Sequence, residues 1–185
     1  MKILENFIKL LVGNFDNSEQ LAILKSKQIE NFPSAKHVNN ICNDKILELP
    51  DDFNGIFLLE ESYYVNKGKA TSLPHLFLFT EDNENIKLTS YELPEGYNKN
   101  NFTYDNFKEI KFSDLKVSEK FTPAIYKNIN GVWEGGSVSM FSPTMKFSLF
   151  ERFSEEKLEV SEIMELDGKV ILGFDEPIIY KRTNK

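Results

Sequence analysis

Short extended segments, separated by turn-forming residues, make up most of the chain after residue 33, and this pattern limits the fold more than any other feature. The turn signals are Pro50-Asp51-Asp52, Asn66-Lys67-Gly68, Glu81-Asp82-Asn83, Pro94-Glu95-Gly96, Asn130-Gly131 and Asp167-Gly168. Asn-Gly and Asp-Gly pairs favour two-residue hairpin turns. Many short strands joined by hairpins are typical of an antiparallel sandwich or barrel, whereas alternating strands and helices would indicate a parallel sheet. The sequence therefore predicts a mainly β fold.

The segment NIKLTSYEL shows the period of a strand most clearly. Its odd and even positions separate into two sets, Ile86, Leu88 and Ser90 against Lys87, Thr89 and Tyr91. Successive side chains of a strand point to opposite faces of a sheet. We interpret this segment as a strand with one buried face.

The first 33 residues have a helical pattern instead. One apolar face is formed by Ile3, Leu4, Phe7, Ile8 and Leu11. Gly13 suits the left-handed conformation that ends a helix. Asp16 or Asn17 can cap a second helix, whose buried face begins at Leu21, Ile23 and Leu24 and which Phe32-Pro33 closes. We expect the pair to be a lid or buttress against a barrel, the simpler alternative being a plain helical hairpin. A short mid-chain helix is also expected in YDNFKEIKFSDL.

Length and charge place the chain in a broad class. A chain of 185 residues, 41% of them hydrophobic and 28% charged, is expected to form a single domain, residues 1–185, with a sizeable core. The net charge of −7 argues against broad nucleic-acid binding and against adhesion to anionic membranes. The charged N-terminal segment predicts no secretion signal, and no run of about 20 apolar residues predicts a membrane span. A single cysteine allows no internal disulfide. We expect a soluble, cytoplasmic protein.

Catalytic motifs are absent from the sequence. His37 and His75 are far apart, and no spacing indicates a nucleophile triad, a metal site or a phosphate-binding loop. Cys42 is interpreted as a buried apolar residue. Gly135-Gly136 is expected to form a bulge or turn.

Carboxylates within apolar strands are the remaining candidates. Because Glu60 and Glu61 are adjacent in a strand-like run, one must point inward if the other points outward. By the same rule Tyr63 shares the face of Glu61, and Ser62 shares that of Glu60. Glu151 and Glu162 lie in similar segments. An inward carboxylate is costly unless it is paired, so it is a candidate for a site. The alternative for each is a solvated, outward glutamate.

Three pieces of sequence, in order, resemble the T-type (CpcT/CpeT) phycobiliprotein chromophore lyases. Gly13, Phe15, Asn17 and Gln20 fit the Gly-x-Phe-x-Asn-x-x-Gln stretch of that family. Glu60-Glu61-Ser62-Tyr63 matches the first and last residues of its Glu-Gln-Ala-Tyr strand. Gly173, Pro177 and Tyr180-Lys181-Arg182 resemble its closing pattern. Two family motifs that contain arginine have no arginine in this chain, at SLPHLF and at SEIMELDGK.

The resemblance implies a calycin-type (lipocalin-like) antiparallel β-barrel with two short N-terminal helices and a short mid-chain helix. It implies binding of a linear tetrapyrrole, a phycobilin such as phycoerythrobilin or phycocyanobilin, and its delivery to a cysteine of a phycobiliprotein β-subunit. No further cofactor or metal is expected, the transfer need not use a nucleophile of this chain, its catalytic residues are left open, and a homodimer is compatible with the family. The expected ligand-binding residues are Glu60, Glu61, Tyr63, Tyr64, His75, Phe77, Phe147, Arg152 and Glu162.

Other residues are open to the same interpretation. Phe79 and Trp133 are further candidates for the walls of the site, and Lys67 and Lys69 for cations at its rim. Filling of the core by the aromatic residues and a solvated turn for the lysines are the simpler alternatives. Two other functions also stay open. One is a bilin chaperone without transfer activity, which the missing arginines favour, and the other is a protein-interaction module whose barrel is filled with side chains.

Overall fold

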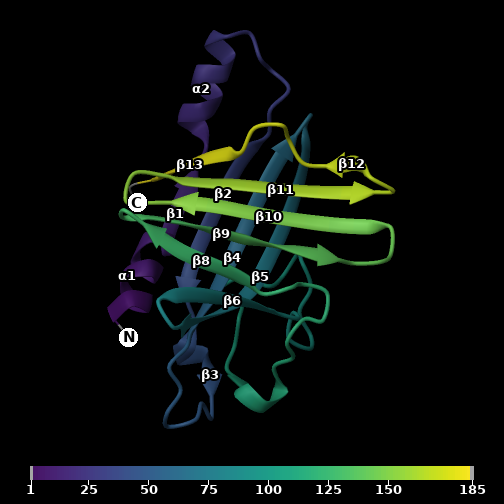
Figure 1. The fold of residues 1–185 in the computed structure, drawn as a ribbon. Coiled ribbons are helices and arrows are strands. Elements are labelled where there is room, and N and C mark those ends of the chain that lie inside the picture. The colour runs from purple at the N-terminus through teal and green to yellow at the C-terminus, as the bar shows by residue number, and fades with distance from the viewer. Residues whose placement is uncertain (1, 184–185) are drawn as a thin grey trace.

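The computed structural model describes residues 2–183, which form a β-barrel with two helices (Figure 1). The helices are α1 (Lys2–Leu11) and α2 (Ser18–Ser26). The strands are β1 (Gly13–Asp16), β2 (Ser34–Ile41), β3 (Ile46–Leu47), β4 (Ile56–Asn66), β5 (Lys69–Asp82), β6 (Asn85–Tyr91), β7 (Ile110–Lys111), β8 (Ala124–Ile129), β9 (Val132–Met140), β10 (Met145–Phe153), β11 (Leu158–Leu166), β12 (Lys169–Leu172) and β13 (Ile178–Arg182).

Ten of these strands close into an antiparallel barrel. Their order is β10-β9-β8-β6-β5-β4-β2-β1-β13-β11, and β11 pairs with β10 to complete the circle. The short β12 pairs with β11 beyond the part of β11 that pairs with β13. The prediction of a mainly β, antiparallel fold is confirmed. Closure selects the barrel over the sandwich, and it leaves none of the ten strands at the edge of an open sheet.

Hairpin turns form where the sequence predicts them. At Asn130-Gly131 and Asp167-Gly168 both residues have positive φ, which is the conformation of a two-residue type I′ turn. Gly135 and Gly136, however, lie within β9 and pair with β8 and β10 on either side. The expectation of a bulge or turn there is wrong. A Cβ at either glycine would meet a backbone carbonyl oxygen of the neighbouring strand.

Helix α1 closes one end of the barrel. Leu4, Phe7, Ile8 and Leu11, on one face, are buried against the interior of the sheet. The Phe7 ring is fully buried and packs 5.0 Å, between ring centroids, from both Trp133 and Phe153. The expected buttress is therefore present.

The second helix differs from its prediction. A short strand, β1, lies between the two helices, and α2 ends at Ser26, well before Phe32-Pro33. Gln20 and Leu24 are its buried residues, whereas Ile23 is 49% exposed. The Gln20 side-chain amide donates to Pro177 O and accepts from Ile179 N, both at 2.9 Å, so this helix is bonded to the start of β13.

The mid-chain helix is not formed. Residues 104–115 contain turns, the two residues of β7 and one 3₁₀ turn, Phe112–Asp114. Phe107 of this region, with Phe102 just before it, packs on the outer face of β4 and β5, against Phe57, Leu59 and Leu76. The segment therefore packs onto the outside of the barrel as an irregular chain and not as a helix.

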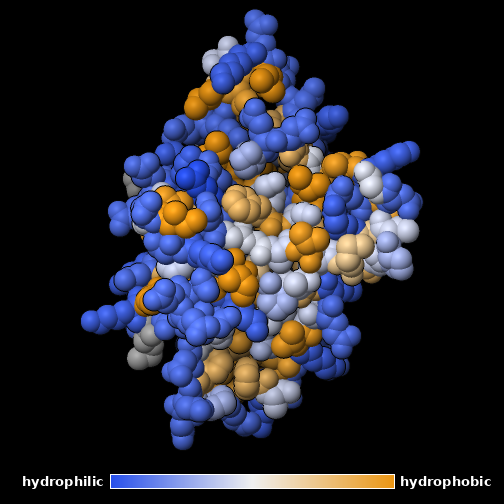
Figure 2. Space-filling model, viewed as in Figure 1, coloured by the Kyte–Doolittle hydropathy of each residue, from blue (hydrophilic) through white to orange (hydrophobic). Residues whose placement is uncertain are grey.

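The molecule thus has two cores. One lies inside the barrel, and the other lies between the outer face of the barrel and two covering segments, residues 42–53 and 93–115. Strands β4 and β5 contribute to both, because alternate residues point inward and outward. The view in Figure 2 shows apolar side chains in several separate groups on a mainly hydrophilic surface. Within residues 2–183, the helices are too short or too polar to cross a bilayer.

Candidate functional site

Strand β4 places one of its two adjacent glutamates inside the barrel. Glu60 lines the interior with Leu58, whereas Glu61 points to the outer face. The parity expected from the sequence is confirmed. A Ser62 hydroxyl on the inner face donates to Glu60 Oε1 at 3.0 Å.

The interior chamber is a small polar space deep in the barrel. Its polar groups include His37 of β2, Glu60 of β4, His75 of β5, and Glu151 and Glu162 of β10 and β11. Aromatic rings surround them, among them Phe77, Phe79, Phe121 and Phe147. The chamber has a volume of about 50 Å³. This is room for a water molecule or a small head group, since one water occupies about 30 Å³ in the liquid.

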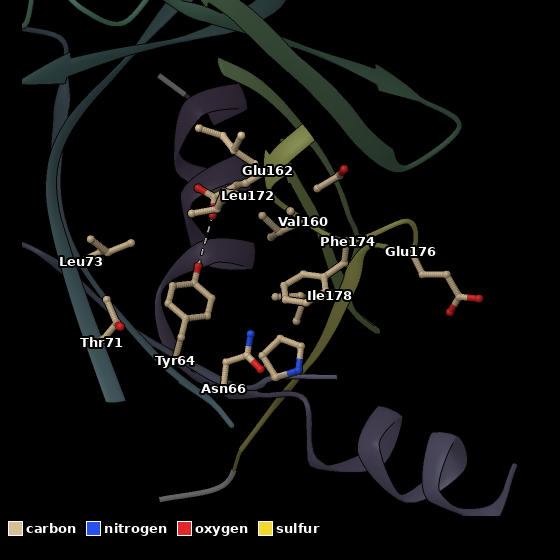
Figure 3. A pocket seen from close by; sticks show the side chains of 14 residues that line it. Tyr64, Asn66, Thr71, Leu73, Val160, Glu162, Leu172, Phe174, Glu176 and Ile178 are labelled. Carbon is tan, nitrogen blue, oxygen red and sulfur yellow. Dashed lines mark hydrogen bonds between the residues drawn. The ribbon is translucent and has the colours of Figure 1, made fainter. Parts of the chain in front are cut away.

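The mouth cleft is larger and lies at the barrel end where β4 turns into β5 (Figure 3). It has a volume of about 370 Å³, and its lining includes Tyr64, Leu73, Glu162, Leu172, Phe174 and Ile178. Figure 3 shows the Tyr64 hydroxyl pointing to Glu162 and Glu176 pointing away from both. Val160 and Glu162 line both cavities, so the mouth cleft and the interior chamber meet at Glu162.

Hydrogen bonds hold two of the carboxylates in place. The Tyr64 hydroxyl donates to Glu162 Oε2 at 3.4 Å, and the Tyr126 hydroxyl donates to Glu151 Oε2. Glu60 Oε2 lies 3.5 Å from His37 Nδ1, but the arrangement is not that of a hydrogen bond. Neither ring nitrogen of His37, which is 2% exposed, has a hydrogen-bond partner.

Burial shifts the acid–base properties of this cluster. Desolvation, with the nearby charge of Glu60, raises the pKa of Glu162 to about 7 and that of Glu151 to about 8. Desolvation lowers the pKa of His37 and of His75, against a smaller raising effect of Glu60. At neutral pH both imidazoles are therefore neutral, Glu151 is mainly protonated and Glu162 is partly ionised.

The structure brings six of the nine expected residues together. Glu60, His75, Phe77, Phe147 and Glu162 line the interior chamber, and Tyr64 lines the mouth cleft. Of the further wall candidates, Phe79 also lines the interior chamber, whereas Trp133 lies in the core against α1. Lys67 and Lys69 are exposed at the β4–β5 turn, next to Asn66 of the cleft.

The other three residues lie on the outside of the barrel. Glu61 accepts from Tyr63 Oη at 2.5 Å and from Tyr104 N at 3.0 Å, so both Glu61 and Tyr63 fasten the covering segment to β4. Arg152 is half-exposed and lies 3.7 Å from Glu134 and 3.9 Å from Glu159 on neighbouring strands. None of the three faces either cavity, because each occupies an outward position of its strand.

Sequence reasoning left two residues out of the site, and it named a third, Glu151, as a candidate carboxylate without including it among the expected ligand-binding residues. Glu151 shares the inward face of β10 with Phe147. His37 faces inward from β2. The only sign of this in the sequence is the apolar Ala35, two positions earlier on the same face. Phe174 reaches the cleft from the irregular segment before β13, for which no periodic signal exists.

The contacts of this cluster fit the binding of hydrogen-bond donors. Cys42 is fully buried in the outer core, and burial raises the pKa of its thiol to about 12. In the described part of the chain no three His, Cys, Asp or Glu side chains are arranged to hold a metal ion. The inward carboxylates and unprotonated imidazoles can instead accept hydrogen bonds from a ligand.

The residues that carry the family resemblance have mainly structural contacts. The Asn17 amide donates to Pro33 O at 2.9 Å and accepts from Ala35 N at 2.8 Å. Arg182 donates to the carbonyl groups of Lys9 and Leu10 at the end of α1 and lies over the ring of Phe15. Neither a scan against protein-family models nor a search of curated proteins finds a match to this chain.

Proposed function

We propose that this chain is a calycin-type phycobilin-binding barrel that takes a linear tetrapyrrole at the mouth cleft and delivers it to a cysteine of a phycobiliprotein β-subunit. The observation that carries the proposal is a carboxylate, Glu162, at the inner end of an apolar cleft that opens on solvent. The order of the family-like sequence pieces supports the identity of the ligand and of its acceptor.

The polar part of the site suits pyrrole nitrogens. These groups donate hydrogen bonds, and a carboxylate accepts them with assistance from its charge. Glu162 already accepts a bond from Tyr64, and its second oxygen, Oε1, is the acceptor that we assign to the pigment.

The apolar part of the site suits a flat conjugated body. Leu73, Leu172 and Ile178 provide aliphatic walls, and Phe174 and Tyr64 provide rings. The volume of about 370 Å³ lies in the lower part of the ~300–1,000 Å³ range of small-molecule sites. A linear tetrapyrrole is long, so the cleft would cover part of it and leave the remainder accessible to the acceptor protein.

Transfer would not require a nucleophile from this chain. The acceptor thiol adds across a carbon–carbon double bond of the pigment, so that sulfur gains a bond to carbon, the thiol hydrogen ends on the pigment, and no oxidant or reductant is consumed. The contribution of the barrel is to hold one conformation and one face of the pigment toward the thiol.

A titration with phycocyanobilin or phycoerythrobilin tests pigment binding. We expect a shifted and sharper visible absorption band, with binding weakened about tenfold or more in Glu162→Gln because the charge of the acceptor is lost. Glu159→Gln is the matched control, since Glu159 is a carboxylate of the same strand, three residues before Glu162, and points to the outer face of the barrel. Unchanged spectra with both pigments would overturn the proposal.

A second experiment separates transfer from transport. The protein, a bilin and an apo β-subunit are incubated, and the acceptor is examined for zinc-induced fluorescence on a denaturing gel. Covalently labelled acceptor supports transfer, and pigment binding without labelling supports the bilin chaperone. The small volume of the interior chamber, about 50 Å³, favours the interaction module as the second candidate, and that function predicts no pigment binding.

A further inference from the structure

Carboxyl groups line the two connected cavities, and the two histidines of the interior chamber are neutral at neutral pH. Glu162 lies where they meet, Glu60 and Glu151 line the interior chamber, and Glu176 lies at the rim of the mouth cleft. Among the described residues that line either cavity there is no lysine or arginine. Lys120 lines an adjoining hollow, which shares His75 and Phe121 with the chamber.

The buried imidazole of His37 is independent evidence that a hydrogen-bond donor is missing from the interior chamber. Both ring nitrogens of His37 lack hydrogen-bond partners, although the side chain is almost completely buried. Buried polar atoms are nearly always paired with protein, water or ligand. A neutral imidazole has one nitrogen that accepts, so this position fits a ligand or water that donates.

We propose that the cavities together bind an amphipathic organic cation, with a protonated amine head group at Glu162 and its apolar body in the mouth cleft. The sizes agree, since the chamber of about 50 Å³ admits a small head group and the cleft of about 370 Å³ admits a ring system or a short chain. This inference rests on the ligand-binding part of the proposed function and is independent of whether the ligand is a pigment.

The head group meets acceptors on several sides. Glu162 faces the chamber from β11, and Glu60 and His37 face it from β4 and β2. An ammonium group has three donors and no acceptor, which matches a set of carboxylate oxygens and an unpaired imidazole nitrogen. Tyr64 and Phe174 add aromatic rings to the wall of the mouth cleft, and the face of such a ring attracts a cation.

The same geometry disfavours an anionic head group. A ligand carboxylate at this position would face the carboxyl groups of Glu60 and Glu162, with no cationic side chain among the described lining residues. Like charges at close range in a partly desolvated space repel strongly. Anionic groups of any ligand would therefore remain outside, in solvent.

Affinity for the cation should depend on pH through Glu162. The groups that face Glu162 are Tyr64 and Glu60 of β4, Glu151 of β10, the two histidines of β2 and β5, and Tyr180 of β13. Since the pKa of Glu162 is raised to about 7, the fraction of ionised Glu162 grows between pH 6 and pH 8. A primary amine stays charged over that interval. Binding should tighten as the pH rises.

The experiment compares three naphthalene probes of similar size with the full chain, by titration calorimetry and naphthalene fluorescence. They are 2-(2-naphthyl)ethylamine, 2-(2-naphthyl)ethanol and 2-naphthylacetate. We expect the amine to bind about tenfold or more tightly than the acetate at pH 8, with the alcohol between them, and to bind more weakly at pH 6. Glu162→Gln should bring the amine close to the alcohol, whereas Glu159→Gln should leave the order unchanged.

Each outcome decides the question. Equal binding of the amine and the acetate, or a preference for the amine in Glu162→Gln equal to that of the unaltered chain, would overturn the inference but leave ligand binding in place. Binding of none of the three probes would overturn the cation inference, and the bilin titration would then decide separately whether pigment binding stands. Thermal unfolding of both variants shows that they are folded.

Discussion

At the scale of single residues, Glu60 and Glu61 show how much one step along a strand decides. Glu60 faces the interior chamber, whereas Glu61 is 7% exposed beneath the segment that covers the outer face. Both are carboxylates in apolar surroundings, but Glu61 has two donors, Tyr63 and Tyr104, that make it a structural anchor. Glu151 and Glu162 each have one tyrosine donor and a raised pKa, so inside the barrel the protonated form is favoured.

Replacement of Glu151 by glutamine should change the pH dependence of stability. A carboxyl group whose pKa is raised from 4.5 to about 8 in the folded state stabilises the fold below pH 4.5, and this stabilisation is lost as the pH rises toward 8. The glutamine introduced by Glu151→Gln stays neutral, and its amide oxygen can still accept from Tyr126. We expect the variant to gain on the order of 4 kcal/mol in free energy of unfolding, relative to the unaltered chain, between pH 5 and pH 8.5.

Urea unfolding at both pH values, followed by the fluorescence of Trp133, measures this difference. The lowered pKa values of His37 and His75 make the folded state less stable as the pH falls below about 6.5. This effect is the same in both proteins, so it cancels in the comparison. Glu159→Gln, on the outer face, should show the pH dependence of the unaltered chain. Parallel curves for Glu151→Gln and the unaltered chain would contradict the raised pKa.

At the scale of elements, the sequence predicts what depends on local periodicity. The alternation of β4 indicated that Glu60 and Glu61 point to opposite faces, without saying which of them points inward, and the helical face of Leu4, Phe7 and Ile8 indicated α1. The mid-chain segment was predicted wrongly as a helix, because Phe107 is buried by an irregular chain on a distant pair of strands. Strand β1 was missed because four residues carry no readable period and pair only with β2 and β13.

The candidate site, too, was predictable only where it depends on local periodicity. Inward carboxylates and aromatics of long strands could be found, but the position of Phe174 depends on how the irregular segment before β13 lies across the barrel mouth. The missed role of Arg152 has a similar cause, since its partners Glu134 and Glu159 lie on two other strands. Pairing between strands is not encoded in either strand alone.

Helix α1 is expected to contribute much of the stability of the inner core through one side chain. Phe7 is fully buried, with its ring within 5.4 Å, between centroids, of Phe79, Tyr126, Trp133 and Phe153. Phe7→Ala should lower the free energy of unfolding by about 3–5 kcal/mol, because the transfer energy is lost and a cavity remains. Denaturant unfolding followed by circular dichroism measures this loss. Ile3→Ala, at a 40% exposed position of the same helix, should cost less than about 1 kcal/mol, and equal losses would contradict the plugging role of α1.

At the scale of the whole molecule, the two cores are joined through the same pair of strands. Leu58 and Phe79 point into the barrel, and Phe57, Leu59 and Leu76 point into the outer core. Loss of the covering segment would expose the outer set to water while the inner set stayed packed. Because β4 and β5 have 11 paired positions between them, the two layers should melt as one unit.

Phe107→Ala tests this coupling from the outer core. Phe107 is 2% exposed and packs 5.1 Å, between centroids, from Phe102, and its carbonyl accepts from Lys45 Nζ at 2.8 Å. If the cores unfold together, the variant should lose about 3–5 kcal/mol in free energy of unfolding. The transition reported by the fluorescence of Trp133, which lies in the inner core, should then move to lower denaturant concentration together with the transition reported by circular dichroism. The exposed Phe150 is the control, since Phe150→Ala removes the same ring from a 50% exposed position of β10. A Trp133 transition that stays in place while the ellipticity changes earlier would mean that the covering segment unfolds by itself and that the barrel is stable without it.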